Sequence, residues 1–357
     1  MDDPDARPSD GPDFDQPFHQ LRVAKVERET ADTISLILSV PDLLKPEFAY
    51  RAGQYLAIRA RVGGKRLTRC YSMSSSPETD KRMRVTVKRV EGGAVSNWIH
   101  DVLKPGDAVE AMVPAGRFCL RPHDNPIVLL GGGSGITPLL SLAKSALATT
   151  QRRVTLVDAN RDRESIVFAA ELDALAAADP GRFRLVHWLD DANGLITSDA
   201  LAELEVLDPV ADVYICGPDA FMKTAEQAVL AAGVDPGHVF FEHFVSPLDA
   251  EGTSDPGDDF FALGRRCESV TITLRKQMVE GAYRHGDTIL DAAMRLGLRP
   301  PFVCRAGECA SCIARVTQGA AAMFANHALA LDEVEGGYIL TCQSVPTSRT
   351  ITLAYED

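Results

Sequence analysis

Four cysteines in the C-terminal part of the sequence have the residue type and spacing to bind iron. Three follow a Cys-x4-Cys-x2-Cys pattern and one comes after a longer gap, at Cys304, Cys309, Cys312 and Cys342. This is the plant-type spacing for a [2Fe–2S] cluster, in which four thiolates converge on two irons. Gly307 in the loop can adopt a positive φ, and its small neighbours let backbone N–H groups approach the cluster sulfurs.

The same cysteines also allow a zinc knuckle or a set of structural thiols. Zinc knuckles usually pair two short Cys-x-x-Cys units, and this stretch contains one, Cys309–Cys312, so the pattern favours the iron–sulfur cluster. The stretch resembles the cluster loop of plant-type ferredoxins. That resemblance implies a β-grasp-like ferredoxin domain at residues 265–357.

The composition is that of a globular chain with an acidic balance. Its 357 residues allow two or three domains, and 45% of them are hydrophobic. The net charge of −13 argues against nucleic acid and anionic membranes as partners. The start has no signal-peptide pattern, and eight cysteines in such a chain do not indicate a disulfide scaffold. We expect a cytoplasmic monomer without a membrane segment and with a disordered acidic tail at residues 1–17.

Residues 18–122 have the pattern of a small antiparallel β-barrel. Runs rich in β-branched and aromatic residues are separated by Gly and Pro, at the short intervals typical of barrel strands. The predicted elements are strands at His19–Arg28, Thr33–Val40, Gln54–Arg61, Arg66–Met73 and Met83–Val90 and a helix at Ala94–Asp101.

One strand end in this barrel carries groups suited to a flavin. Arg69 could pair with a pyrophosphate, Tyr71 could lie on the isoalloxazine ring, and Ser72 could hydrogen-bond the ring edge. A Ser-rich strand end before a proline is equally consistent with a simple turn. On the flavin interpretation, Tyr71 and Ser72 are candidate catalytic residues as well as cofactor-binding residues.

This Arg-x-Tyr-Ser stretch resembles the flavin motif of the ferredoxin–NADP reductase superfamily. A second element, starting at Gly92, resembles that superfamily's Gly-x-x-Ser turn, where backbone N–H groups and the helix dipole favour a phosphate. The resemblance implies a flavin, with FAD expected in preference to FMN. It places Gly93 and Ser96 at the phosphate and Val87 and Lys88 beside the flavin or its ribityl chain.

Residues 123–245 change to an alternation of short apolar strands and helices, which predicts a doubly wound parallel sheet. A Gly-rich turn joins the first strand to the first helix, where backbone N–H groups can meet a pyrophosphate. The turn lacks the G-x-G-x-x-G form, but its position at the first crossover supports a nucleotide site. Its candidate binding residues are Gly132, Gly133, Gly135 and Thr137.

A later strand ends in Cys216-Gly217-Pro218, on the same edge of the predicted sheet. Taken alone, Cys216 is typical of an inert buried thiol. The turn is similar to one in the nicotinamide-nucleotide half of the ferredoxin–NADP reductases, which implies that Cys216 positions the nicotinamide and that Gly217 and Pro218 line its site. The resemblance also implies a flavin-shielding aromatic residue near the end of the domain, for which Phe244 is the candidate.

The coenzyme is predicted to be NADH, with NADPH possible. Asp158 ends the second strand of the sheet, where an acid can accept hydrogen bonds from ribose hydroxyls and repel a 2′-phosphate. Arg161 and Arg163 follow closely and could bind that phosphate instead. The sequence leaves this competition open.

Residues 246–264 are rich in Pro, Gly, Ser and Asp, which predicts an extended linker. Its reach would let the ferredoxin domain receive electrons at the flavin and then turn toward an acceptor. In the domain that follows, we expect a hairpin around Arg275–Met278 and a helix capped by Asp287.

The order of the three domains resembles that of reductase components of bacterial multicomponent oxygenases, including the steroid 9α-hydroxylase and phenylacetyl-CoA epoxidase types. The resemblance implies a multidomain α+β and α/β enzyme that passes electrons from NAD(P)H through FAD and a [2Fe–2S] cluster to a terminal oxygenase, which we expect to hold a Rieske centre. Two alternatives remain. One is an electron-transfer partner of dihydroorotate dehydrogenase, whose fourth cysteine lies closer than Cys342 does here; the other is a redox sensor without turnover.

Overall fold

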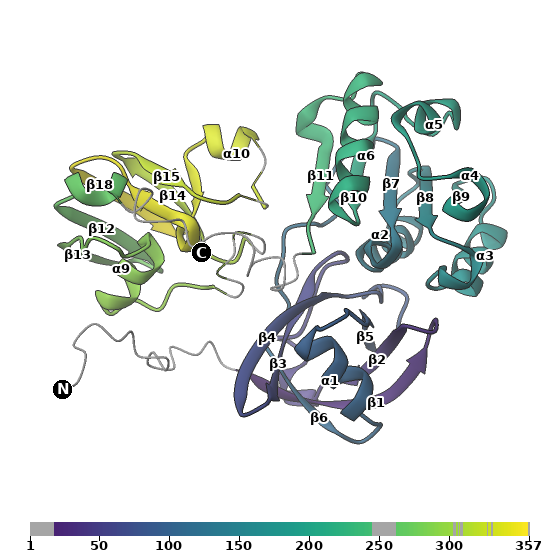
Figure 1. The fold of residues 1–357 in the computed structure, drawn as a ribbon, viewed down its shortest axis with the longest axis horizontal. Helices are drawn as coiled ribbons and strands as arrows, with labels where there is room; N and C mark the ends of the chain where they lie inside the picture. The colour runs from purple at the N-terminus through teal and green to yellow at the C-terminus, as the bar shows by residue number, and fades with distance from the viewer. Residues whose placement is uncertain are drawn as a thin grey trace.

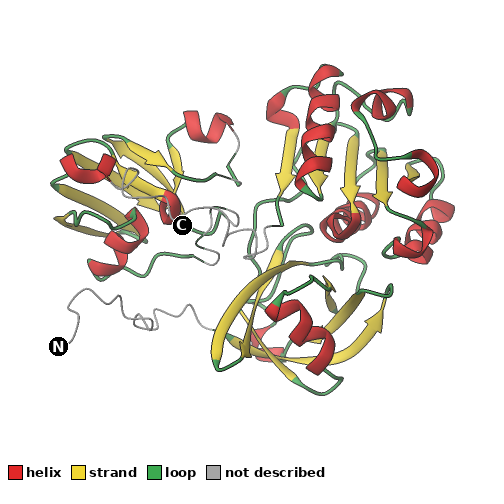
Figure 2. Cartoon of the chain, in the orientation of Figure 1, coloured by secondary structure: helices red, strands yellow, loops and turns green. Residues whose placement is uncertain are grey.

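The computed structural model describes residues 18–244, 262–302, 305, 307, 310–326, 328–329 and 331–355. The predicted tail at residues 1–17 and most of the predicted linker lie outside the described residues, as do Cys304 and Cys309. The described chain forms three lobes (Figure 1). Figure 2 shows that the first is mainly strands, that helices flank the strands of the second, and that the third combines strands with short helices.

Six antiparallel strands form the first lobe, in the order β4-β3-β6-β1-β2-β5. Their bounds are β1 His19–Arg28, β2 Thr33–Ser39, β3 Tyr55–Val62, β4 Lys65–Ser72, β5 Met83–Lys88 and β6 Ala108–Ala111. A bridge between Met73 and Val85 joins the two edges of the sheet, so the lobe closes into the predicted barrel. Inward-facing side chains fill its core, to which helix α1 (Ala94–Val102) adds Val95 and Ile99.

Five parallel strands form the sheet of the second lobe, in the order β11-β10-β7-β8-β9. The strands are β7 Ile127–Gly132, β8 Val154–Asn160, β9 Phe183–Leu189, β10 Asp212–Cys216 and β11 Val239–Glu242. The helices are α2 Ile136–Thr149, α3 Ala169–Ala178, α4 Asp190–Asn193, α5 Ser198–Glu203 and α6 Asp219–Ala231. One face of the sheet packs against α2 and α3 and the other against α5 and α6, which gives two apolar cores and confirms the doubly wound prediction.

The third lobe has a mixed five-stranded sheet, in the order β13-β12-β18-β14-β16, and a two-stranded sheet, β15-β17. The strands are β12 Ser269–Leu274, β13 Gln277–Ala282, β14 Ile313–Gln318, β15 Ala321–Met323, β16 Tyr338–Leu340, β17 Ser344–Pro346 and β18 Thr350–Tyr355. The helices are α9 Ile289–Arg295 and α10 Leu331–Glu335. Apolar residues of α9 pack into the core of the larger sheet, as the β-grasp-like prediction requires.

Two local predictions for this lobe have different outcomes. The expected hairpin forms, and its turn residues Arg275 and Lys276 both have positive φ. The predicted helix cap is wrong. Thr288 caps α9, because its Oγ1 accepts from the Asp291 N–H at 3.1 Å while the Asp291 carboxylate accepts from the Thr288 N–H at 3.2 Å. Asp287 instead pairs with Arg295 at 2.8 Å.

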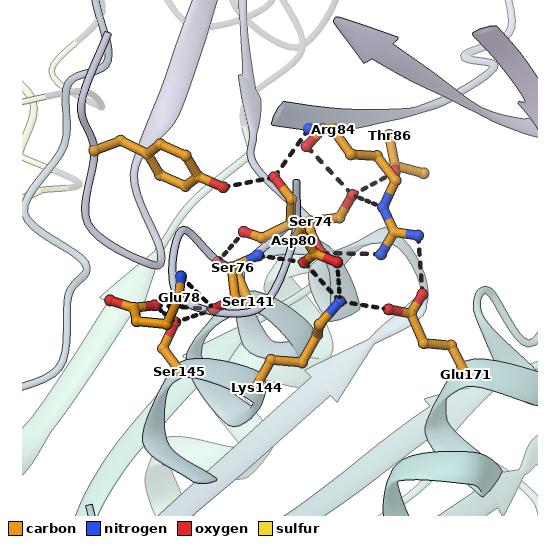
Figure 3. A network of polar contacts seen from close by, with 12 residues as sticks. Ser74, Ser76, Glu78, Asp80, Arg84, Thr86, Ser141, Lys144, Ser145 and Glu171 are labelled. Carbon is orange, nitrogen blue, oxygen red and sulfur yellow. Dashed lines mark hydrogen bonds and ion pairs between the residues drawn. The ribbon is translucent and has the colours of Figure 1, made fainter. Parts of the chain in front are cut away.

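A network of polar side chains, here called the lysine network, joins the first two lobes (Figure 3). Lys144 of α2 lies 2.6 Å from Asp80 of the barrel and 2.7 Å from Glu171 of α3. Arg84 of β5 contacts the same Glu171 at 2.9 Å. The network continues through five serines, Ser74, Ser75, Ser76, Ser141 and Ser145. Because the contacts cross the domain boundary repeatedly, they fix the barrel against the parallel sheet.

Candidate functional site

Strand β4 presents the Arg-x-Tyr-Ser stretch at the side of the barrel that faces the α/β lobe. Ser72 is buried and Tyr71 is half-buried. Burial raises the pKa of the Tyr71 hydroxyl above its ordinary value, so the hydroxyl stays protonated. Arg69 donates one hydrogen bond to the Thr68 carbonyl at 2.7 Å, and a guanidinium has further N–H groups to offer a phosphate.

The two predicted flavin neighbours on β5 point in different directions. The Val87 side chain is fully buried in the barrel core, so only its backbone could border a flavin. Lys88 is half-buried and lies 3.7 Å from Asp32. A Cβ built on Gly133 would lie 3.9 Å from the Lys88 Nζ, so this ammonium reaches from the barrel to the Gly-rich turn of the other lobe.

The second predicted flavin element forms the N-terminus of α1, with Gly93 at the N-cap. A Cβ on Gly93 would lie 2.6 Å from the Ser96 Oγ and 2.9 Å from the Val90 Cβ, so the turn has no room for a side chain. Ser96 Oγ accepts a hydrogen bond from the Val90 N–H at 3.2 Å, which holds the turn in place. Backbone N–H groups at the start of α1 are therefore available to an anionic phosphate.

The Gly-rich turn and the Cys-Gly-Pro turn interlock at the carboxyl edge of the parallel sheet. A Cβ on Gly135 would lie 2.0 Å from the Cys216 carbonyl oxygen, and one on Gly132 would lie 2.9 Å from the Pro218 Cδ. Thr137 donates from its Oγ1 to the Ser134 carbonyl at 3.0 Å and so stiffens the first turn. These glycines are required by close backbone approach, and the two turns lie together at the carboxyl ends of the strands, where parallel sheets commonly bind nucleotides.

Three residues from the first two lobes meet beside these turns. Cys216 on β10 and Glu242 on β11 are register neighbours in adjacent parallel strands. Ser72 of the barrel donates from its Oγ to the Glu242 Oε1 at 3.5 Å. The flavin strand and the nicotinamide turn therefore come together at this one point. We call Ser72, Cys216 and Glu242 the reaction-centre group.

Burial keeps two members of the reaction-centre group uncharged. It raises the pKa of the Cys216 thiol well above its ordinary value, which excludes a thiolate at neutral pH. It also raises the pKa of the Glu242 carboxyl to about 8, while the hydrogen bond from Ser72 opposes the shift. A neutral carboxylic acid can donate as well as accept a hydrogen bond. The group can therefore hold a proton beside the place where a hydride would move.

The remaining nucleotide candidates lie at the carboxyl end of β8 and beyond. Asp158 is fully buried and pairs with the Nδ1 of His187 at 3.1 Å, and burial raises the pKa of its carboxyl. Its Oδ1 is buried without a hydrogen-bond partner among the described residues, as is the Nδ2 of Asn160. Both atoms are shielded from the surface, so a ribose could contact them only after a local rearrangement, and the ribose role of Asp158 stays a prediction. Arg161 is exposed and lies 3.9 Å from Asp32 of the barrel.

Phe244, the predicted flavin shield, is the last described residue before the linker, and its side chain is exposed. It lies two residues beyond Glu242, the last residue of β11. An exposed aromatic ring in this position can cover a bound flavin. That role stays a prediction.

The predicted cluster loop is partly described. Cys312 and Cys342 are both buried and belong to one small apolar cluster, and the Cys312 carbonyl accepts from the Thr341 Oγ1 at 2.8 Å. Gly307 has a φ of +79° and a Cβ there would lie 2.8 Å from the Ala325 carbonyl oxygen, so this tight turn requires glycine. Two thiols buried in one cluster, with the turn at Gly307 packed against Gln343 next to Cys342, fit an iron–sulfur cluster. Cys304 and Cys309, as the other two ligands, stay predictions.

Sequence reasoning missed Glu242 and Tyr55. The available signal for Glu242 was a carboxylate in a strand of a parallel sheet, where both faces are normally apolar. Tyr55 has no comparable local signal. It opens β3 in register with Ser72, and its hydroxyl lies 2.7 Å from the Ser311 Oγ of the third lobe.

Three family models match successive parts of the chain. They are an oxidoreductase FAD-binding domain at residues 20–119, an oxidoreductase NAD-binding domain at 129–227 and a 2Fe-2S iron-sulfur cluster binding domain at 273–347. A curated relative from Rhodococcus rhodochrous, the ferredoxin reductase component of 3-ketosteroid-9-alpha-monooxygenase, is 38% identical over 94% of this chain and 96% of its own length. The chain belongs to this family of oxygenase reductases.

A second relative and a solved structure also match nearly the whole chain. A component of the 1,2-phenylacetyl-CoA epoxidase from Escherichia coli is 32% identical over 95% of this chain and 98% of its own length. A solved structure of phthalate dioxygenase reductase has a TM-score of 0.57 and 27% identity, with coverage of 95% of this chain and 98% of that one. These findings confirm the predicted three-domain fold and the FAD, NAD and [2Fe–2S] cofactors. Within the described residues, no helix has the length and apolar composition to cross a membrane.

Proposed function

We propose that this oxygenase reductase carries electrons from NADH to a terminal oxygenase that holds a Rieske centre, of the type that hydroxylates steroids at the 9α position. The observation that carries the proposal is the reaction-centre group, because a flavin strand and a nicotinamide turn meet there through Ser72 and Glu242. The name of the Rhodococcus rhodochrous relative supports the steroid type. Bound FAD would supply the conversion between a two-electron donor and a one-electron cluster.

The residues of the chain then have distinct tasks. Arg69, Gly93 and Ser96 hold the flavin phosphates, and Tyr71 covers the ring. Gly132, Gly133, Gly135 and Thr137 shape the turn that meets the coenzyme pyrophosphate, with Asp158 and Arg161 near its ribose end. Cys216, Gly217 and Pro218 position the nicotinamide, and Ser72 and Glu242 provide hydrogen-bonding groups beside the place where the hydride would move.

The proposal is tested by anaerobic reduction of the purified protein. NADH should bleach the flavin and iron–sulfur absorbance in succession, and the reduced protein should then support turnover of a steroid 9α-hydroxylase oxygenase component. Turnover only with a phenylacetyl-CoA epoxidase would assign the chain to that type instead, which the 32% identical relative would support. A redox sensor would be reduced without sustained turnover with either oxygenase or with ferricyanide, and that result would refute the proposal.

A further inference from the structure

One hydrogen bond connects the strand pair of the flavin motif with the cluster-binding loop. The Tyr55 hydroxyl and the Ser311 Oγ lie 2.7 Å apart, and either can donate. Tyr55 is the register partner of Ser72, so it belongs to the same strand pair as the reaction-centre group. Ser311 lies between Cys309 and Cys312 in the sequence. The tyrosine side chain therefore spans from the flavin site to the loop that is predicted to hold the cluster.

The barrel holds Tyr55 rigidly. The side chain is only 3% exposed, and the backbone N–H donates to the Ala115 carbonyl at 2.8 Å. Gly116 has a φ of +114°, and a Cβ there would lie 3.0 Å from the Tyr55 ring, so this backbone packs directly on the ring. A residue fixed in this way loses little further freedom when its hydroxyl meets a partner.

A second contact joins the same barrel loop to the third lobe. Arg117, the residue after Gly116, lies 2.6 Å from Glu333 of α10 through its Nη1, with side-chain exposures of 41% and 19%. A cavity of about 140 Å³ lies beside the Arg117–Glu333 pair, both of whose residues line it. Glu242 lines it from the reductase side and Leu329 from the ferredoxin side. An interface with directed contacts around a cavity is one that can separate.

We propose that Tyr55 is a positioning residue for electron delivery, whose hydroxyl holds the cluster-binding loop through Ser311 at the flavin site. The Arg117–Glu333 pair is the second point of attachment and fixes the rotation of the third lobe. Among the described residues, these two directed contacts restrict the orientation of the third lobe, and both can break to release the loop toward an oxygenase. This inference rests on the proposed function for its purpose, but the docking geometry itself can be measured independently.

The decisive variants remove the hydroxyls one at a time. Tyr55→Phe and Ser311→Ala should leave reduction of the flavin by NADH within about twofold of wild type. Each should slow the subsequent reduction of the cluster by roughly three- to tenfold, which is the equilibrium shift that one lost hydrogen bond causes. The double variant should be no slower than the slower single variant, because both changes remove the same bond. Ser311→Thr keeps a hydroxyl and should restore the rate. Iron and sulfide content shows that each variant retains its cluster.

Tyr50→Phe is the matched control. The Tyr50 hydroxyl makes the same kind of tyrosine–serine hydrogen bond, at 2.7 Å to the Ser75 Oγ, but both residues lie on the reductase side. In Tyr50→Phe, the ratio of the cluster-reduction rate to the flavin-reduction rate should stay at the wild-type value. Small-angle X-ray scattering gives a readout that needs no electron transfer. The radius of gyration should increase in Tyr55→Phe and Ser311→Ala and remain unchanged in Tyr50→Phe.

The ion pair is tested through salt. In wild type, cluster reduction should slow as salt is added, because the Arg117–Glu333 pair is half-exposed and salt weakens it in part. In Arg117→Gln this salt dependence should be weaker. Arg349→Gln, which breaks the exposed pair with Glu268 at 2.9 Å inside the third lobe, should keep it.

Two outcomes would overturn the inference. One is wild-type cluster reduction and unchanged scattering in both hydroxyl variants; the other is a double variant whose effects add. If wild type itself fails to reduce its cluster with NADH, the proposed function fails, and the scattering comparison still decides the docking contact.

Discussion

The barrel meets its two neighbours through interfaces of different construction. Against the α/β lobe it has the lysine network, in which charged groups and buried serines from both lobes interleave (Figure 3). Against the third lobe it has the Tyr55–Ser311 and Arg117–Glu333 contacts and a cavity beside the second of them. The difference matches two kinds of chemistry. Hydride transfer needs atoms held in near contact, whereas electron delivery to a separate protein needs a donor that can be released.

The largest expected effect separates electron transfer at the flavin from electron transfer through the cluster. Cys342→Ser, which changes a buried cysteine beside Cys312, should abolish the iron–sulfur absorbance and the transfer of electrons to an oxygenase. Reduction of ferricyanide by NADH should stay within about twofold of wild type, because the lysine network and the reaction-centre group are untouched. Metal and sulfide analysis checks the ligand assignment, and a full complement of both in the variant would contradict it.

Breaking the rigid interface should impair the first step instead. Lys144→Met leaves Asp80 and Glu171 without their shared ammonium, and both carboxylates are partly buried. We expect a loss of about 1–2 kcal/mol in the free energy of unfolding and a roughly three- to tenfold lower kcat/KM for NADH with ferricyanide. The wild-type ratio of cluster reduction to flavin reduction should be retained.

Lys45→Met is the control for that variant. It removes a surface ion pair with Asp42 at 2.7 Å, away from both interfaces. Its stability and its kcat/KM should match wild type. Equal losses in both lysine variants, measured by denaturant unfolding and steady-state kinetics, would show that the lysine network has no special role.

A smaller effect concerns the pH dependence of stability caused by Glu242, which contacts the barrel through Ser72 and lines the cavity beside the third lobe. Burial raises the pKa of the Glu242 carboxyl to about 8, above its ordinary value of 4.5. The folded state therefore binds a proton that the unfolded state has released, and this group lowers stability progressively as pH rises between those two values. Glu242→Gln removes this dependence, so its melting temperature should rise relative to wild type from about pH 5 to pH 8.

The same variant has an effect on activity. In wild type, kcat/KM for NADH should fall with a pKa near that of the Glu242 carboxyl. In Glu242→Gln it should be flat over the same pH range, because an amide does not titrate there. Parallel melting and rate profiles in the two proteins would contradict a raised pKa of the Glu242 carboxyl.

The smallest expected effect is on coenzyme choice. We expect NADH to be preferred, because Asp158 places a carboxyl near the carboxyl end of β8 and Asp32 lies 3.9 Å from Arg161. Asp32→Ala should free Arg161 and raise kcat/KM for NADPH by roughly two- to threefold, with little change for NADH. Steady-state rates with both coenzymes test this. A wild-type preference for NADPH would mean that the arginines already dominate.

The sequence predicted much of this fold because its signals are local. Alternation of side chains along β1 and β2 fixes the barrel face of each strand, and the change to strand–helix alternation after residue 123 fixes the parallel sheet. It predicted the wrong cap for α9, because Asp287 and Thr288 both have capping side chains. Only the backbone position of Asp291 decides which of them closes the box.

The sequence by itself determined the cofactors of this protein, since most groups of each motif stand close together in the chain and act on one ligand. The four cysteines, the stretch from Arg69 to Ser72 and the Cys216 turn are of this kind. Only the tertiary structure decided which side chains connect the sites of those ligands. Glu242 reaches Ser72 because two parallel strands pair in one register, and Tyr55 meets Ser311 because two lobes dock. Register and docking depend on packing between distant segments, and no local spacing encodes them.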